Sequence, residues 1–256
     1  MTADHLVTPE PGVVVHPDQQ SLADAAAARL VPALLDAQGR TGEAQVVLTG
    51  GSLGSEIIRS LTHVPGRSAV DWSRVRVWWG DERFLPRGHA DRNDTQNDEA
   101  GLTSLGLDPA KVHRVPGPDE ADTAEESAAA YAETLLRHGA APFDVLILGV
   151  GPDGHVASLF PHHDAQRTTG APTVAVHESP KPPPDRVSLT FERLARARET
   201  WFLVAGRDKA DAVAAALRPG TDRWDVPASE PKGSEATRWL VDVEAAAGLS
   251  WRPAGS

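Results

Sequence analysis

The 256-residue sequence contains no cysteine. Disulfides, zinc–cysteine sites and thiol nucleophiles are therefore excluded. The absence of disulfides fits a reducing compartment, and we expect the protein to be cytoplasmic. No apolar run approaches the length of a membrane span. The opening segment, MTADHLVTPEPG, lacks a basic patch followed by an apolar run, so we expect no signal peptide.

Positive charge is also scarce. The chain has 25 Lys and Arg residues against 36 Asp and Glu residues, a net charge of −11 at pH 7. A surface of this kind repels nucleic acid and anionic membranes, and we expect neither as a partner. A small anionic substrate would need a local positive pocket, so individual arginines and lysines in loops become candidates for its binding.

Short apolar runs alternate with alanine-rich helical patterns along the chain. Strands are predicted within 13–16, 44–51, 74–82, 112–115, 143–151, 173–178, 186–191, 200–206 and 238–243, and helices at 21–39, 52–61, 94–105, 122–138, from 155 and at 209–217. This alternation favours an α/β fold with a mostly parallel sheet covered on both faces. Nothing marks a domain boundary, so we predict a single α/β domain over residues 1–256. We expect a monomer, with a weak homodimer as the alternative.

Three of the predicted strands end in polar loops that contain glycine: LTGGS (48–52), WWGDER (78–83) and GVGPDGH (149–155). In open parallel sheets, ligands bind outside the carboxyl ends of the strands. We therefore expect these three loops to meet at one edge of the sheet.

In the first loop, Gly50 and Gly51 precede a helix that is predicted to start with Ser52 as its N-cap. Free backbone N–H groups and the positive end of the helix would suit a phosphate or carboxylate. The segment is neither a Walker loop nor a G-x-G-x-x-G motif. A tight strand–helix turn without a ligand is the alternative.

The second loop places three charged residues directly after an apolar strand. The planar fork of Arg83 suits an anion. Asp81 or Glu82 would then act as a base or hold Arg83 in place. The alternative is a strand end with an internal ion pair.

The third loop brings Asp153 within two residues of His155. A turn can set the carboxylate against one imidazole nitrogen, which fixes the tautomer and leaves the other nitrogen as a general base. The alternative is a helix-capping aspartate beside an incidental histidine. His162, His163 and Asp164 follow, but their spacing from His155 matches no common zinc pattern, so we predict no metal. A serine hydrolase is excluded because no G-x-S-x-G elbow is present.

Three further cations lie in or beside loops. Lys181 is carried by the stiff segment SPKPPPDR, Arg186 starts a strand, and Lys209 opens a helix after WFLVAG. Each would neutralise part of a phosphate group, although an isolated lysine is more often solvated surface. A cation at a helix start is locally unfavourable, which favours a functional reason for Lys209.

Taken together, the motifs resemble those of a known family. LTGGS, VWWGDERFLP with ADRNDTQN after it, LGVGPDGHVASLFP, SPKPPPDRVSLT and WFLVAGRDKADAV occur in the order, and at roughly the spacing, of the 6-phosphogluconolactonase family. That family is similar to the glucosamine-6-phosphate isomerase/deaminase group. The resemblance spans about residues 14–245, and GPDGHVASLFP together with GDER is its specific part.

The resemblance implies hydrolysis of 6-phospho-D-glucono-1,5-lactone to 6-phosphogluconate in the oxidative pentose phosphate pathway. It also implies a modified Rossmann-like three-layer sandwich that needs no metal or cofactor. His155 would activate water and Asp153 would orient it. The substrate-binding positions that it implies are Gly50, Gly51, Ser52, Asp81, Arg83, Lys181, Arg186 and Lys209. It leaves Glu82, Asn93 and Asn97 without an assigned role.

Two other functions stay open. A sugar-phosphate deaminase or isomerase is the first, and Asp81 aligns with the catalytic aspartate of that branch. Against it, the deaminases carry a carboxylate soon after their Asp-Gly-His segment, whereas here VASLFP contains none before Asp164. The second is a non-catalytic sugar-phosphate sensor, which the retained His155 and Asp153 and the lack of an appended DNA-binding segment disfavour.

Overall fold

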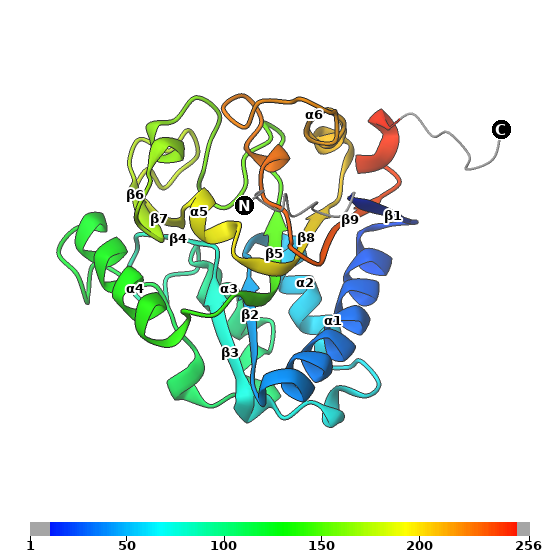
Figure 1. Cartoon of the computed structure of the whole chain (residues 1–256), viewed down its shortest axis with the longest axis vertical. Helices are drawn as coiled ribbons and strands as arrows, with labels where there is room; N and C mark the ends of the chain where they lie inside the picture. The colour runs from blue at the N-terminus through cyan, green and yellow to red at the C-terminus, as the bar shows by residue number, and fades with distance from the viewer. Residues whose placement is uncertain (1–10, 250–256) are drawn as a thin grey trace, which may run out of the picture.

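The computed structural model describes residues 11–249. The first ten residues, on which the expectation of no signal peptide mainly rests, lie outside them. Nine strands and six α-helices occur in the described part (Figure 1). The strands are β1 (Gly12–His16), β2 (Ala44–Leu48), β3 (Val75–Trp79), β4 (Asp81–Arg83), β5 (Phe143–Gly149), β6 (Thr173–Val176), β7 (Arg186–Leu189), β8 (Ala197–Val204) and β9 (Ala236–Asp242). The helices are α1 (Gln19–Thr41), α2 (Gly51–Leu61), α3 (Asn93–Glu99), α4 (Ala124–His138), α5 (Phe191–Leu194) and α6 (Ala210–Ala216).

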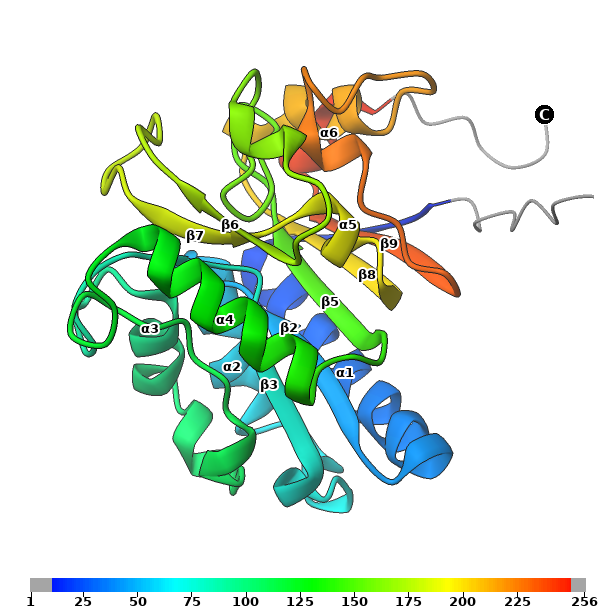
Figure 2. The ribbon, with the colours of Figure 1, turned by 60° about the vertical axis from the view of Figure 1, so that its left-hand side comes forward.

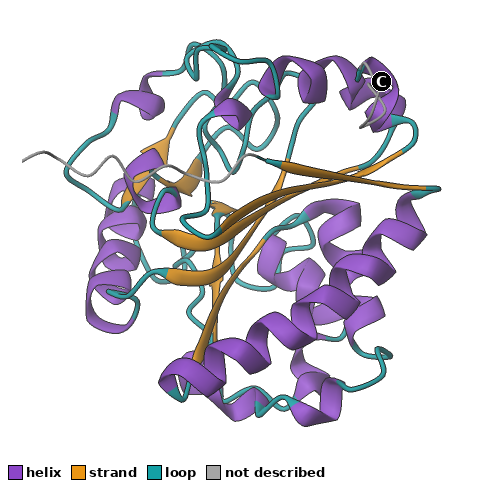
Figure 3. Cartoon of the chain, turned by 45° about the vertical axis from the view of Figure 1, so that its right-hand side comes forward, coloured by secondary structure: helices purple, strands orange, loops and turns teal. Residues whose placement is uncertain are grey.

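Six strands form a parallel sheet in the order β1-β9-β8-β5-β2-β3. Its central strand β5 is buried on both faces, because Leu146 and Leu148 point into one apolar core and Val145 and Ile147 into the other. Helices α1 and α2 cover the second core, and α4 and α6 contribute to the first (Figure 3). The predicted three-layer α/β fold with a mostly parallel sheet is confirmed.

A second, antiparallel sheet of three strands, in the order β4-β7-β6, lies beside α4 (Figure 2). We predicted a loop after Trp79, but residues 81–83 form strand β4 of this second sheet. Gly80 joins the two sheets, because its N–H donates to Leu48 in the parallel sheet and its carbonyl accepts from Leu189 in the other. The alternation of β4 points Asp81 and Arg83 to one side and Glu82 to the other.

The helix predicted to begin at His155 is wrong. The chain instead makes tight turns, with a bridge between Val156 and Leu159 and a hydrogen bond from the Gly151 N–H to the His155 carbonyl at 3.0 Å. Gly154 and Ala157 both have positive φ, at 83° and 50°. Residues in that region cannot continue a right-handed helix, so local geometry stops it.

Several predicted boundaries also move. Helix α2 begins at Gly51 with Gly50 as its N-cap, so Ser52 is inside the helix and is not its cap. Helix α1 continues past Gly39 and ends at Thr41. The predicted strand at 112–115 is reduced to one bridge between Val112 and Val77.

Between residues 11 and 249, none of the helices combines the length and apolar character that crossing a membrane requires.

Acid is expected to destabilise the fold through His113. The residue is 8% exposed, and its ring stacks on Trp78 at a centroid distance of 4.0 Å. Burial, with the nearby His138 and Arg76, lowers the pKa of His113 from 6.5 to about 4. The unfolded chain therefore binds a proton on this residue between pH 6.5 and 4 that the folded chain does not. The free energy of unfolding should fall with decreasing pH across that window, at up to about 1.4 kcal/mol per pH unit.

Urea titrations between pH 7 and pH 4 measure this effect. The variant His113→Phe keeps an aromatic ring against Trp78 but has no titrating group there, so its stability should depend less steeply on pH. An equal slope in both proteins would contradict the assignment.

Candidate active site

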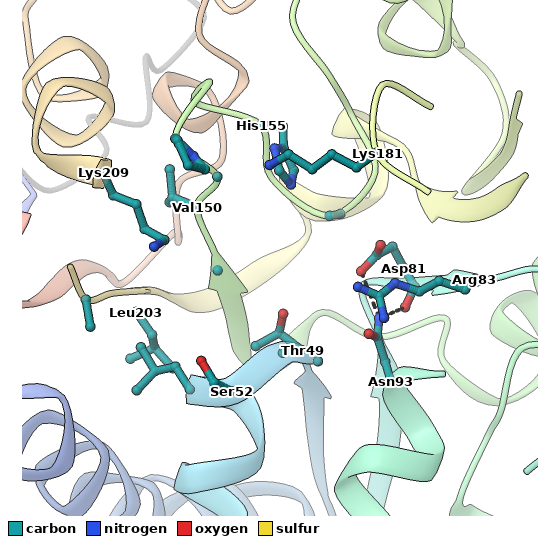
Figure 4. Close-up of a pocket in the computed structure, with 18 of the residues that line it drawn as sticks. Thr49, Ser52, Asp81, Arg83, Asn93, Val150, His155, Lys181, Leu203 and Lys209 are labelled. Carbon is teal, nitrogen blue, oxygen red and sulfur yellow. Dashed lines mark hydrogen bonds between the residues drawn. The ribbon is translucent and has the colours of Figure 1, made fainter. Parts of the chain in front are cut away.

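The three predicted loops meet at the carboxyl end of the parallel sheet, around a cavity of about 270 Å³. Nine of the ten residues that the sequence singled out line it: Gly50, Gly51, Ser52, Asp81, Arg83, His155, Lys181, Arg186 and Lys209. The tenth, Asp153, contacts His155. Figure 4 shows Ser52 on one wall of the cavity, Asp81 and Arg83 on another, and His155 above them.

His155 and Asp153 form a tight pair, with Nδ1 and Oδ1 2.5 Å apart. A β-carbon on Gly151 would lie 2.1 Å from the imidazole, so only glycine permits this ring position. Phe160 packs on the ring at a centroid distance of 4.5 Å. Partial burial raises the pKa of Asp153, but the hydrogen bond and charge of His155 and the charge of Lys181 outweigh it and lower the pKa to about 2.

The ionised Asp153 can only accept a hydrogen bond, so Nδ1 of His155 must carry the proton. Nε2 is then the basic nitrogen of the neutral ring. Within residues 11–249, no side chain or backbone group hydrogen-bonds this Nε2. The arrangement can therefore take a proton from water at Nε2 while the carboxylate stabilises the imidazolium that forms.

The glycine loop is supported by one face of α3. Asn93 packs against Gly50 so closely that a β-carbon there would lie 1.8 Å from its Oδ1. Gln96 accepts a hydrogen bond from the Gly51 N–H at 3.1 Å, and Asn97 donates to the Thr49 carbonyl at 3.3 Å. These roles were not predicted from the sequence. Amide side chains at i, i+3 and i+4 were the available signal, because that spacing shares one helical face.

Asp81 is already engaged within the protein. Its Oδ2 accepts from the Ser158 hydroxyl at 2.6 Å. Its Oδ1 accepts from the Asn93 amide at 3.2 Å, and Figure 4 shows these two side chains together. The nearest cation is Arg186, at 3.9 Å. Asp81 thus ties together three parts of the pocket wall.

Arg83 projects from the same face of β4. Its guanidinium donates to the carbonyl of Asp91. Among residues 11–249, no carboxylate lies within ion-pairing distance of it. The alternative of a strand end closed by an internal Asp81–Arg83 or Glu82–Arg83 ion pair is therefore not what the structure holds, and the positive charge remains available at the pocket.

Glu82 points away from the pocket and is 1% exposed. It accepts hydrogen bonds from the N–H groups of Arg83, Asn93 and Asp94 at 2.9, 2.7 and 2.9 Å. Burial and the neighbouring Asp94 raise the pKa of Glu82 to about 7, against the opposing charge of Arg92. Glu82 therefore fastens the backbone of Arg83 to the first turn of α3.

Two lysines reach the pocket from other segments. Figure 4 shows Lys209 extending into the cavity from one side and Lys181 extending toward His155 from another. Lys181 Nζ lies 3.7 Å from Asp153 Oδ1, and Lys209 Nζ lies 3.0 Å from Asp208. With Arg83 they give this end of an acidic protein a concentration of positive charge.

The alternative metal ligands are not gathered around His155. His162 lies 3.6 Å from Asp225, and Nε2 of His163 lies 2.8 Å from the carbonyl of His177. Among residues 11–249, no group of three or more histidines and carboxylates is placed to hold a metal ion.

A parallel α/β fold with a histidine–aspartate pair over a cation-rich pocket defines an enzyme that acts on a small anionic molecule. Comparison with known proteins identifies which kind. The chain belongs to the glucosamine-6-phosphate isomerase/6-phosphogluconolactonase family, whose model matches residues 17–239. The family resemblance of the sequence motifs is therefore confirmed.

Individual relatives agree with this placement. The chain is 50% identical over 249 residues to a 6-phosphogluconolactonase of Streptomyces coelicolor, covering 93% of this chain and 95% of that protein. The solved 6-phosphogluconolactonase of Trypanosoma brucei superposes with a TM-score of 0.81 at 25% identity, covering 94% of this chain and 99% of that one. A monomeric glucosamine-6-phosphate deaminase superposes with a TM-score of 0.77 at 19% identity, over 93% of this chain and all of that one, which shows the shared fold alone.

Proposed function

We propose that this protein is a 6-phosphogluconolactonase, which hydrolyses 6-phospho-D-glucono-1,5-lactone to 6-phosphogluconate in the oxidative pentose phosphate pathway. One observation carries the proposal: the His155–Asp153 pair faces the same cavity as Arg83, Lys181 and Lys209. The 50% identity to a 6-phosphogluconolactonase over nearly the full length of both chains supports it.

The chemistry needs one base and one water. Nε2 of His155 takes a proton from water as the water oxygen attacks the lactone carbonyl, and Asp153 stabilises the resulting imidazolium. The carbonyl oxygen gains negative charge, for which the Ser52 hydroxyl and the N–H groups that follow Gly51 in the first turn of α2 are the available donors. The ring C–O bond then breaks, and the ring oxygen takes the proton from the imidazolium. The carboxylic acid that forms then ionises to 6-phosphogluconate and releases its proton to the solvent, which leaves His155 neutral for the next cycle.

The phosphate group is remote from the bond that breaks, so its role is to anchor and orient the substrate. We propose that Arg83, Lys181 and Lys209 share this task, while the loop Gly50–Gly51–Ser52 contacts the lactone end of the substrate. Each of the three cations contributes a positive charge at the cavity wall. These cations concentrate positive charge at the phosphate site, although the whole chain carries a net charge of −11.

A deaminase or isomerase reaction has less support. Ring opening and isomerisation need further acid–base groups, and the segment VASLFP supplies none. Asp81 already accepts hydrogen bonds from Ser158 and Asn93, so it is poorly placed to act as a base. A non-catalytic sensor would not need the ionised Asp153 to hold His155 with its basic nitrogen free.

Two assays on the purified protein separate these functions. Acid release from freshly prepared 6-phosphogluconolactone should exceed spontaneous hydrolysis, whereas glucosamine-6-phosphate should yield no ammonia above a protein-free blank. Ammonia release without lactone hydrolysis would replace the proposal with the deaminase function. Inactivity on both, with tight phosphosugar binding, would favour the sensor.

The remaining expectations follow from the same site. The mechanism uses no metal or cofactor, and we expect the enzyme to act as a monomer in the cytoplasm on a free phosphosugar lactone. Nucleic acid is not an expected partner, because the net charge of −11 opposes it.

A further inference from the structure

Arg186 is a buried arginine at the cavity, although the sequence predicted a substrate contact for it. It starts β7, and only 4% of the residue is exposed. Its Nε donates to the Pro183 carbonyl at 3.2 Å, and its Nη2 donates to the carbonyls of Lys181 and Pro182 at 2.9 and 3.2 Å. Two of its three nitrogens therefore serve three consecutive carbonyls of one loop.

The third nitrogen, Nη1, faces the floor of the site. It lies 3.5 Å from the Ser158 hydroxyl and 3.9 Å from Asp81 Oδ2, and the guanidinium carbon lies 5.5 Å from the ring centre of Phe160. The guanidinium is thus surrounded by partners from its own protein. Little donor capacity is left for a bound anion.

The loop that Arg186 holds is the one that carries Lys181. The Lys181 side chain leaves it to reach within 3.7 Å of Asp153 at the mouth of the pocket. Ser179 braces the same loop, because its hydroxyl donates to the Lys181 carbonyl at 2.9 Å. The backbone of Lys181 is therefore fixed from two directions, and its ammonium group is the part left to move.

The geometry points to Arg186 as a positioning residue, which sets the reach of Lys181 and does not itself bind the substrate. The inference rests on the proposed function, because it assigns Lys181 to the phosphate of the lactone. A planar guanidinium can bond several carbonyls at once, whereas the ammonium group of a lysine is a point donor. Arg186→Lys keeps the buried charge beside Asp81 but gives up most of the hold on the loop.

A four-protein kinetic comparison tests this: wild type, Lys181→Met, Arg186→Lys and the double variant, with KM and kcat for 6-phosphogluconolactone. We expect Lys181→Met to raise KM on the order of tenfold, and Arg186→Lys to raise it about three- to tenfold with kcat little changed. In the double variant, KM should equal that of Lys181→Met alone, because the inference has Arg186 act on the substrate through Lys181.

Two further measurements keep the outcome clear if Arg186→Lys folds poorly in a thermal melt. Ser179→Ala loosens the same loop without touching a buried charge, and its smaller rise in KM should likewise vanish beside Lys181→Met. Unphosphorylated glucono-1,5-lactone is the matched substrate. In the loop variants its kcat/KM should fall much less than that of the phosphorylated lactone, whereas general damage to the site would lower both equally.

Three results would overturn the inference: an unchanged KM in Lys181→Met, KM increases that multiply in the double variant, or an equal loss on both lactones. Failure of the proposed function would look different, because the wild-type enzyme would then not accelerate hydrolysis of the phosphorylated lactone at all.

Discussion

Replacing His155 with asparagine is expected to lower kcat by roughly 10²–10⁴. The amide N–H of asparagine can take the place of Nδ1–H and keep a hydrogen bond to Asp153. The variant therefore keeps its local structure but has no nitrogen that accepts a proton from water. The residual rate should approach the spontaneous hydrolysis of the lactone, which must be subtracted in a pH-stat measurement of acid release.

His162→Asn provides the matched control for this variant. His162 lies seven residues further along the chain, and its side chain is 63% exposed and outside the cavity lining. Its φ of 59° is one that asparagine tolerates, so the substitution should leave both stability and kcat unchanged. If His155→Asn turned over at the wild-type rate while folded, His155 would not be the base.

Arg83→Ala is expected to raise KM by about 10- to 100-fold, with a smaller effect on kcat. Between residues 11 and 249, the Arg83 guanidinium has no carboxylate partner, and it projects from β4 into the cavity. Alanine removes an ionised donor that would bind the phosphate, and it leaves no buried acid unpaired. The loss therefore falls on binding of the substrate and less on the stability of the fold.

Arg87→Ala is the control for that experiment. Arg87 lies four residues away but pairs with Glu120 and is outside the cavity lining, so KM should not change. Substrate choice adds a second check, because unphosphorylated glucono-1,5-lactone should lose little with either variant. A wild-type KM in Arg83→Ala would remove Arg83 from the phosphate site.

The parts of the fold that the sequence predicted are those governed by local pattern. The run FDVLILG is apolar at successive positions, which is the mark of a strand buried on both faces, and β5 is that strand. The rule that ligands bind at the carboxyl ends of such strands then pointed to the glycine loop and to His155. Local pattern misled at VASLFP, because its composition suits a helix while the positive φ of Gly154 and Ala157 prevents one.

Other features were beyond the sequence because they depend on residues far apart in the chain. The hydrogen bond between Ser158 and Asp81 spans 77 positions. The charge of Arg83 is left without a carboxylate because Glu82 turns toward α3 and Asp81 bonds Ser158 and Asn93. Likewise, nothing in SPKPPPDR indicates that Arg186 bonds the backbone of the loop before it and not a ligand.

The class of fold, the meeting of three loops at one edge and the histidine–aspartate pair could all be inferred from the amino-acid sequence. They follow from hydrophobic periodicity, from the alternation of strands and helices along the sequence and from short-range spacing of residues. All three can be seen in the chain before it folds. Which charged side chains face the cavity, and which are bonded to other parts of the protein, could be seen only after folding brought distant residues together. The role of each charged side chain depends on which distant groups packing places within hydrogen-bonding distance of it. A buried polar group needs such a partner.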